Sequence, residues 1–258
     1  MRIAAYQYAV TSDIKKNFET IQKAIRQAKE QQAELVLFPE CALTGYPPRD
    51  LPSSSDVDFN LVESCCEELQ KFCDETSVAF VVGTIALDEG KIYNRAIFFR
   101  PYTACEVYDK RALWGWDRDN FQKGQKRGIT EYKGFRIGIR ICFEVRFPEY
   151  FRELYQEKTD LDLVLFYDVT DSENIERYNM IKGHLQTRAV ENVCPVLTSN
   201  TIAPYQTAPT VLFGRSGQVL AENSRNEEGL IVFDLEKKEY DFGERGRAEI
   251  SDELVQKL

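Results

Sequence analysis

The stretch that most constrains the fold lies at residues 136–150 and reads Arg-Ile-Gly-Ile-Arg-Ile-Cys-Phe-Glu-Val-Arg-Phe-Pro-Glu-Tyr. Its apolar residues alternate up to Cys142, which predicts a buried strand that ends at a thiol. Glu144, Arg146 and Glu149 follow on a predicted turn into a helix. Most cysteines are small core residues, but a nucleophilic thiol needs polar neighbours that form and pair its thiolate. Further segments must decide between these two interpretations.

Two other predicted strands also end at a charged residue. Leu35–Phe38 is a continuous apolar run, typical of a strand buried on both faces, and Pro39 should end it and place Glu40 beyond it. Lys110 ends a strand-like segment that starts at Cys105. Taken singly, such charged residues usually lie on the surface.

Together, a carboxylate, an ammonium group and a thiol at strand ends have a chemical purpose. The Glu40 carboxylate can accept the thiol proton, and the Cys142 thiolate can then attack a carbonyl carbon. The Lys110 ammonium can stabilise the oxyanion that develops. The three segments therefore favour a hydrolytic site over three unrelated packing or surface residues.

These segments resemble the signature motifs of the nitrilase superfamily of carbon–nitrogen hydrolases. The motifs are Phe-Pro-Glu40, Tyr-Asp-Lys110 and Ile-Cys-Phe-Glu-Val-Arg-Phe-Pro-Glu149, and the likeness continues through residues 186–192, 198–200 and 210–220. It covers essentially the whole chain, from the first strand to Asp234. The resemblance implies that Glu40 is the general base and acid, Lys110 the oxyanion stabiliser and Cys142 the nucleophile.

Many members of this superfamily place a second glutamate between the lysine and the cysteine, shortly before a Phe-x-x-Gly sequence. Here residues 116–124 read Trp-Asp-Arg-Asp-Asn-Phe-Gln-Lys-Gly, so Asp117 is the nearest match and Asp119 is its rival. Arg140, two residues before the thiol, also departs from the small residues common at that position.

Four residues are predicted to contact substrate. Phe143 follows the nucleophile, Trp114 lies in the aromatic stretch between lysine and cysteine, and Tyr46 belongs to the loop after Glu40. The aromatic stretch around Trp114 is alternatively part of the core. Arg146 resembles an arginine of relatives that act on ω-amides, where it would pair with a substrate carboxylate. A structural salt bridge from Arg146 to Glu149 or Glu144 is the alternative.

The resemblance implies hydrolysis of small, linear, non-peptide amides through a cysteine thioester, with release of ammonia or an amine. An N-carbamoyl amidohydrolase or a nitrilase is the alternative within the superfamily. Residues 42–51 resemble the loop of the glutaminase domain in glutamine-dependent NAD synthetases, so a glutaminase-like subunit also stays open. A non-catalytic binding relative is disfavoured by the complete set of three residues. A dyad of Cys142 with His184, the only histidine, is the less favoured mechanism.

Strands and helices alternate along the chain, which predicts an α/β protein with a single domain over residues 1–258. The resemblance implies the specific architecture, a four-layer α-β-β-α sandwich. The segment 45–56, with its three prolines and three serines, is the one loop-rich section. The expected helices are residues 17–32, 59–76, 150–158 and 175–192. The expected strands are residues 2–9, 35–38, 78–87, 91–100, 136–141, 161–167, 194–200, 209–213, 218–222 and 229–234.

The composition excludes several other classes of protein. A net charge of −9 disfavours nucleic-acid binding, which needs a basic face. No segment reaches the roughly 18 to 20 consecutive apolar residues of a membrane-spanning helix, and the N-terminal residues lack the apolar core of a signal peptide. The seven cysteines form no Cys-x-x-Cys pair, which fits neither a disulfide framework nor a zinc site. We therefore expect a cytoplasmic enzyme that needs no metal and no organic cofactor.

Members of the superfamily commonly dimerise through helices, so the resemblance implies a homodimer. The expected helices over residues 150–158 and 175–192 carry aromatic and other apolar side chains that are enriched at interfaces. The alternative is that these side chains face the core of their own subunit. They are Tyr150, Phe151, Leu154, Tyr155, Tyr178, Met180 and Ile181.

Overall fold

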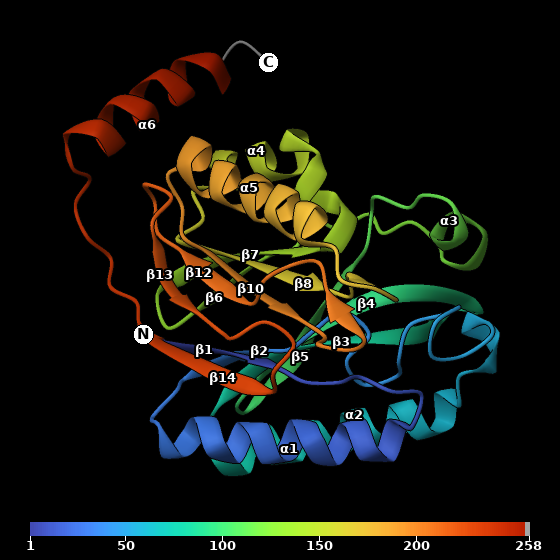
Figure 1. The fold of residues 1–258 in the computed structure, drawn as a ribbon. Coiled ribbons are helices and arrows are strands. Elements are labelled where there is room, and N and C mark those ends of the chain that lie inside the picture. The colour runs from blue at the N-terminus through green and yellow to red at the C-terminus, as the bar shows by residue number, and fades with distance from the viewer. Residues whose placement is uncertain (256–258) are drawn as a thin grey trace.

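Two six-stranded sheets face each other in the computed structural model, which describes residues 1–255 (Figure 1). The first sheet has the strand order β14 (Gly229–Asp234), β1 (Arg2–Gln7), β2 (Leu35–Leu37), β3 (Ala79–Asp88), β4 (Lys91–Arg100), β5 (Thr103–Asp109). The second has the order β13 (Val219–Glu222), β12 (Val211–Phe213), β10 (Val196–Asn200), β8 (Leu161–Phe166), β7 (Phe135–Ile141), β6 (Ile129–Tyr132). A small third sheet pairs β9 (Val169–Thr170) with β11 (Tyr205–Gln206).

Helices cover both outer faces of this pair of sheets (Figure 1). On the first sheet lie α1 (Ile14–Glu30) and α2 (Phe59–Thr76), and on the second lie α4 (Pro148–Gln156) and α5 (Ile175–Asn192). The remaining helices are the short α3 (Trp116–Asn120), the C-terminal α6 (Phe242–Val255) and the 3-10 turns η1 (Ser54–Asp56) and η2 (Cys142–Arg146). The expected four-layer α-β-β-α sandwich is confirmed.

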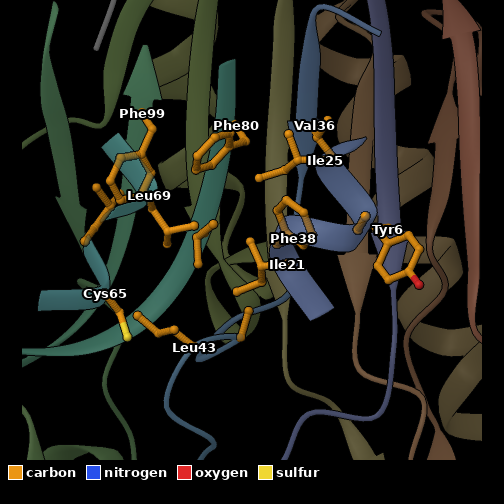
Figure 2. Packing of buried hydrophobic residues seen from close by; sticks show 14 of the residues in the cluster. Tyr6, Ile21, Ile25, Val36, Phe38, Leu43, Cys65, Leu69, Phe80 and Phe99 are labelled. Atoms are coloured by element: carbon orange, nitrogen blue, oxygen red, sulfur yellow. The ribbon is translucent and has the colours of Figure 1, made fainter. Parts of the chain in front are cut away.

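Three apolar layers hold the sandwich together. Strands buried on both faces supply side chains alternately to the space between the sheets and to the space beneath the helices. Figure 2 shows the first of the helix-facing layers, where Ile21 and Leu69 of α1 and α2 meet Phe38, Phe80 and Phe99 of the first sheet. Close packing on both faces of each sheet fixes the strand ends on which the polar residues of interest lie.

Local sequence signals account for most element boundaries. The Asp58 carboxylate accepts a hydrogen bond from the Leu61 N–H at 3.0 Å and begins α2 at the expected residue. The hairpin between β3 and β4 turns at Glu89 and Gly90, both at positive φ, which suits the twist of the flanking antiparallel strands. Asp13 caps α1, which therefore begins at Ile14 rather than at the expected Asn17.

The helix α6 was not predicted from the sequence pattern. Its buried side chains are those of Glu244, Ala248 and Ser251, so the helix lacks the apolar stripe by which an amphipathic helix is recognised. It is fixed by polar contacts instead: the Tyr155 hydroxyl of α4 donates to the Ala248 carbonyl at 2.7 Å. The short strand β6 was missed for a related reason, because only Thr130 of its four residues is buried.

Most of the side chains expected at a subunit interface lie inside the protein. Phe151, Leu154, Tyr155, Tyr178 and Ile181 are buried against their own sheet or neighbouring elements, as the alternative interpretation held. Among the seven residues, only Met180 is exposed, whereas Tyr150 is partly buried. The helices α4 and α5 therefore use their aromatic residues mainly as core.

One buried carboxyl group has no evident structural partner. Asp162 of β8 is completely buried beneath the helices, and neither of its carboxylate oxygens has a hydrogen-bond partner among the described residues. Burial raises the pKa of this group to about 6, and the nearby Thr159 hydroxyl and the charge of Arg140 oppose the shift only in part. The pKa of Asp162 in the folded protein thus exceeds 3.8, the ordinary value for an aspartate.

Asp162 should make the protein less stable as the pH rises. Because its pKa is raised in the folded protein, Asp162 makes its full contribution to the free energy of unfolding below about pH 4. This contribution is lost as the pH rises through about 6, by ~1.4 kcal/mol for each unit by which the pKa is raised. We expect Asp162→Asn to increase the free energy of unfolding by about 1–3 kcal/mol at pH 8 and by about half as much at pH 5. Urea unfolding at both pH values measures the change. Asp119→Asn, at an exposed aspartate, is the control, and equal effects of the two substitutions would contradict the prediction.

Candidate active site

The three predicted catalytic residues follow strands that end at the same edge of the sandwich. β2 and β3 are parallel, β5 runs in the same direction because it pairs antiparallel with β4, and β7 is parallel to β8 in the second sheet. Glu40 lies just beyond β2 and Lys110 just beyond β5. The two sheets are joined at this edge, because the Glu40 N–H donates to the Phe166 carbonyl at the end of β8 at 3.2 Å.

Glu40 is held by donors from three different elements. Its Oε1 accepts from Asn94 Nδ2 at 2.7 Å and from Lys110 Nζ at 2.8 Å, and its Oε2 accepts from the Tyr167 N–H at 2.8 Å. Burial raises the pKa of the Glu40 carboxyl, and the positive charge of Lys110 opposes this only in part. A carboxylate in such a setting is a better proton acceptor than one in water.

Two glycines let the backbone approach these residues closely. A Cβ atom at Gly83 of β3 would lie 2.6 Å from the Glu40 Cα and 2.4 Å from the Pro39 carbonyl oxygen. A Cβ atom at Gly124 would lie 2.0 Å from the carbonyl oxygen of Asp109, the residue before Lys110. Both positions exclude side chains, which fixes the backbone around the carboxylate and the ammonium group.

Lys110 joins two carboxylates in a buried ionic cluster. Its Nζ lies 2.8 Å from Glu40 Oε1 and 2.7 Å from Asp117 Oδ2, and the three side chains are 2%, 1% and 7% exposed for lysine, glutamate and aspartate. Burial lowers the pKa of Lys110, but the charges of Glu40 and Asp117 outweigh it and raise that pKa well above its ordinary value. The lysine therefore stays positively charged inside the protein.

The structure brings Asp117, and not Asp119, into this cluster. The Tyr46 hydroxyl donates to Asp117 Oδ1, while Lys110 occupies Oδ2. Both aspartates lie on α3, but Asp119 is exposed and has no hydrogen bond or ion pair among the described residues. Asp117 is one methylene shorter than a glutamate, and α3 brings it close enough to reach the lysine.

Cys142 lies in a strained turn directly after β7. Its φ of +45° belongs to the left-handed region that non-glycine residues rarely adopt, and it is the first residue of η2. The side chain is partly exposed, and burial together with the negative charge of Glu40 raises the thiol pKa well above its ordinary value. The group is therefore a protonated thiol, and a base would have to remove its proton before the sulfur could act as a nucleophile.

Glu144 fixes the turn that carries Cys142. This fully buried carboxylate accepts from the Ile141 N–H at 2.7 Å, the Arg111 N–H at 2.7 Å and the Tyr108 hydroxyl at 2.7 Å. It therefore ties the end of β7 to the backbone next to Lys110. The sequence marked Glu144 only as one charge among several near the thiol, because its hydrogen-bond donors come largely from distant segments.

The residues predicted to bind substrate divide into two groups. Phe143 and Trp114 share a cavity of about 420 Å³ that opens between the loop after Lys110 and the turn after Cys142. Tyr46 does not line this cavity, and its ring stacks on Tyr167 with centroids 5.1 Å apart. Trp114 is 68% exposed, so the alternative that it belongs to the core is wrong.

Arg146 forms no salt bridge among residues 1–255, so the alternative of an ion pair with Glu149 or Glu144 is wrong, and Glu144 accepts from the Ile141 and Arg111 N–H groups. Its guanidinium lies 5.5 Å from the centre of the Phe143 ring instead.

His184 lies on α5 and has no hydrogen bond to Cys142 in the described structure, which removes the geometric support for a Cys–His dyad.

The structure adds residues that the sequence did not single out. Asn94 and the Tyr167 backbone hold Glu40, and Asp168 follows at the end of β8, where Arg177 pairs with it through two nitrogens at 2.8 and 2.7 Å. Asn94 is followed by Arg95 within a strand pattern, and neither residue type gives a signal that Glu40 is the partner of Asn94. No described helix has the length and apolar character to cross a membrane, and no described group of histidines, cysteines and carboxylates is arranged to hold a metal ion.

The paired sheets, covered by helices on both outer faces, define the architectural class as an α-β-β-α sandwich. The model of the carbon–nitrogen hydrolase family matches residues 2–241, so the chain belongs to that family. It is a nitrilase-superfamily enzyme of the amidase type.

Individual relatives agree with this assignment. An amidase of the nitrilase superfamily from Nesterenkonia sp. AN1 has a similar structure, with a TM-score of 0.81 and 26% identity over 98% of this chain and 97% of that one. An (R)-stereoselective amidase of a Pseudomonas species is 25% identical over 86% of this chain and 83% of its own length. A glutamine-dependent NAD(+) synthetase of Aquifex aeolicus is 23% identical over 93% of this chain, which spans only 42% of that protein.

Proposed function

We propose that this enzyme hydrolyses small, linear, non-peptide amides through a thioester on Cys142 and releases ammonia or an amine. The observation that carries this proposal is the buried cluster of Glu40, Lys110 and Asp117 at the strand edge where the strained turn presents Cys142. Further support comes from electrostatics: the pKa of Glu40 is raised, Lys110 is positively charged, and both charges act on the pKa of the Cys142 thiol.

The first half-reaction acylates the thiol. Glu40 accepts the proton of the Cys142 thiol as the sulfur attacks the amide carbonyl carbon. Lys110 and backbone N–H groups in the first turn of η2 stabilise the tetrahedral oxyanion, because the first N–H groups of a helical turn lack partners within it. The carbon–nitrogen bond then breaks, the departing nitrogen takes the proton from Glu40, and a thioester remains.

The second half-reaction returns the enzyme to its starting state. Glu40 accepts a proton from water as the oxygen attacks the thioester carbonyl carbon, and the same donors stabilise the second oxyanion. The carbon–sulfur bond breaks, the carboxylic acid leaves, and the thiolate regains its proton from Glu40. Support comes from the Nesterenkonia amidase, a mutant of which carries the acetamide moiety of fluoroacetamide added covalently at the active site cysteine.

Asp117 holds Lys110 in place and keeps it charged. We expect Asp117→Asn to lower kcat/KM by about 10²-fold, because the lysine loses one of its two anionic partners and its position opposite the oxyanion. Steady-state ammonia release at pH 7 measures the effect. Asp119→Asn on the same short helix removes an equal charge from an exposed site and should change kcat/KM less than about twofold. A larger loss of kcat/KM in Asp119→Asn than in Asp117→Asn would show that Asp119, and not Asp117, supports the lysine.

A panel of substrates tests the proposed reaction against its alternatives. Ammonia release would be followed for small aliphatic amides, ω-amides including glutamine, N-carbamoyl amino acids and nitriles. The proposal expects the highest kcat/KM for an amide. Preferential turnover of a carbamoyl compound or a nitrile would replace it, glutamine as the best substrate would favour a glutaminase-like subunit, and no turnover would favour a binding protein.

We further propose a homodimer that forms through the helical face of the second sheet. Five large apolar side chains of α5 and α6 remain exposed: Ile175 (49%), Met180 (43%), Phe242 (96%), Ile250 (55%) and Leu254 (56%). Association would remove these side chains from water. Light scattering at micromolar concentration tests the proposal, and a fully active monomer would refute it.

A cytoplasmic location is the last part of the proposal. All seven cysteines are free thiols in the structure, including the exposed Cys105, and a reducing compartment keeps such thiols unpaired. Cell fractionation followed by immunodetection tests this, and recovery of the protein in an oxidising compartment would contradict it.

A further inference from the structure

One cavity of the protein is built from the segments that follow two of the proposed catalytic residues, Lys110 and Cys142. One wall is the loop after Lys110, with Trp114, and the other is the turn and helix start after Cys142, with Phe143 and Phe147. Its volume of about 420 Å³ is within the range of small-molecule sites. Two of its lining residues, Arg111 and Phe143, directly follow Lys110 and Cys142 in the chain, so the cavity borders the segments that carry the ammonium group and the thiol.

Aromatic rings supply the apolar part of the lining. Phe143 and Phe147 meet edge to face, with centroids 5.2 Å apart, and Phe147 also meets Tyr150 at 6.2 Å. Trp114 stands opposite in the other wall and is 68% exposed. Such rings pack well against a flat or apolar body, and large exposed aromatic residues commonly mark a binding surface.

The charged part of the lining is positive. Arg111, Arg118 and Lys123 line the cavity, and it has no carboxylate among its lining residues. Glu153 neutralises Arg111, whereas Arg118 and Lys123 have no ion pair within residues 1–255. The Arg118 guanidinium lies 5.4 Å from the centre of the Trp114 ring. Two uncompensated cations in one cavity are notable in a chain whose net charge is −9.

We infer that this cavity binds the distal end of the substrate, and that the preferred substrates are amides with an aromatic or apolar body ending in a carboxylate. The inference rests on the proposed amidase function and specifies its substrate class. The rings would cover the body of the molecule, and Arg118 and Lys123 would bind its carboxylate through charge-assisted hydrogen bonds. The amide would then lie at the inner end, next to Cys142.

A pair of matched amides tests this inference in the full-length enzyme. The probes are 3-(4-carboxyphenyl)propanamide and 3-(4-methylphenyl)propanamide, which differ only in the charged or neutral group at the distal end. We expect the wild-type enzyme to have the higher kcat/KM for the carboxylate. In the Arg118→Gln/Lys123→Gln double variant, the ratio of the two kcat/KM values should fall by about tenfold or more, mainly through KM.

Lys126→Gln is the matched control, since it removes one positive charge from the same loop but from outside the cavity. In this variant, the ratio of the kcat/KM values for the two amides should stay within twofold of the wild-type ratio. Hydrolysis of both amides with the same ratio in the wild type and the double variant would overturn the inference while leaving the proposed function intact. No hydrolysis of either amide, together with no acylation of Cys142, would contradict the proposed function and the inference with it.

Discussion

Replacement of Cys142 by alanine is expected to lower kcat for amide hydrolysis by at least about 10⁴-fold. The variant keeps the ionic cluster and the cavity but loses the only group that forms the thioester, so the remaining residues contribute only binding and charge stabilisation. The thiol is partly exposed and makes no hydrogen bond among the described residues, so the fold should tolerate its removal. Ammonia release under saturating substrate measures the loss.

Cys105→Ala is the control for this substitution because Cys105 is an exposed free thiol on β5, remote in sequence from the turn. It should retain full activity. The assignment of the nucleophile fails if the alanine variant of Cys142 keeps more than a few per cent of the wild-type kcat while its thermal unfolding is unchanged.

Glu40→Gln is expected to lower kcat by about 10³-fold. The amide of glutamine cannot accept the thiol proton, and its NH2 group would face the donors that now converge on the carboxylate from Asn94, Lys110 and the Tyr167 backbone. The wild-type pH profile of kcat/KM should also have an acidic limb above 4.5, the ordinary pKa of a glutamate, because burial raises the pKa of Glu40. Below that limb the base is protonated and activity falls.

The pH profile distinguishes loss of a base from loss of structure. In the glutamine variant this acidic limb should disappear, and its residual rate should be flat across the same range. Glu34→Gln, at a partly exposed glutamate paired with Lys133, should keep the wild-type profile. An unchanged acidic limb in the Glu40 variant would show that another group accepts the proton.

The sequence predicted those parts of the fold that are set by local pattern. Continuous apolar runs located β2 and β8, and the Asp-Glu-Gly turn located the hairpin between β3 and β4. The packing of the two sheets came from the family resemblance alone, since periodicity does not distinguish one buried face from another. The helix α6 was missed because its buried side chains are polar or small.

The site was predictable where a residue ends a strand and unpredictable where contacts cross the chain. Glu40, Lys110 and Cys142 could be singled out because each lies at the end of a predicted strand. The choice between Asp117 and Asp119 required α3, which turns one aspartate towards Lys110 and leaves the other in solvent.

The tertiary contacts of Glu144 and Arg146 were not visible in the motif. Glu144 accepts a hydrogen bond from the backbone N–H of Arg111, which is 33 residues away in the sequence. No local sequence pattern could therefore predict that Glu144 holds the turn. Arg146 lies over Phe143 instead of pairing with a neighbouring glutamate. The residues expected at a subunit interface were mostly buried within the subunit for a similar reason. An aromatic side chain on a helix gives the same sequence pattern whether it faces a partner or its own sheet.

The proposed mechanism depends on covalent acylation of Cys142, and mass spectrometry of the enzyme during turnover tests it most directly. Acid quenching within milliseconds of mixing with a small amide, followed by peptide mapping, should reveal the acyl mass on the peptide that contains Cys142. The adduct should be absent from Cys142→Ala and should disappear once substrate is exhausted. Rapid amide hydrolysis with no acyl adduct on Cys142, or with the adduct on another cysteine, would contradict the proposed mechanism.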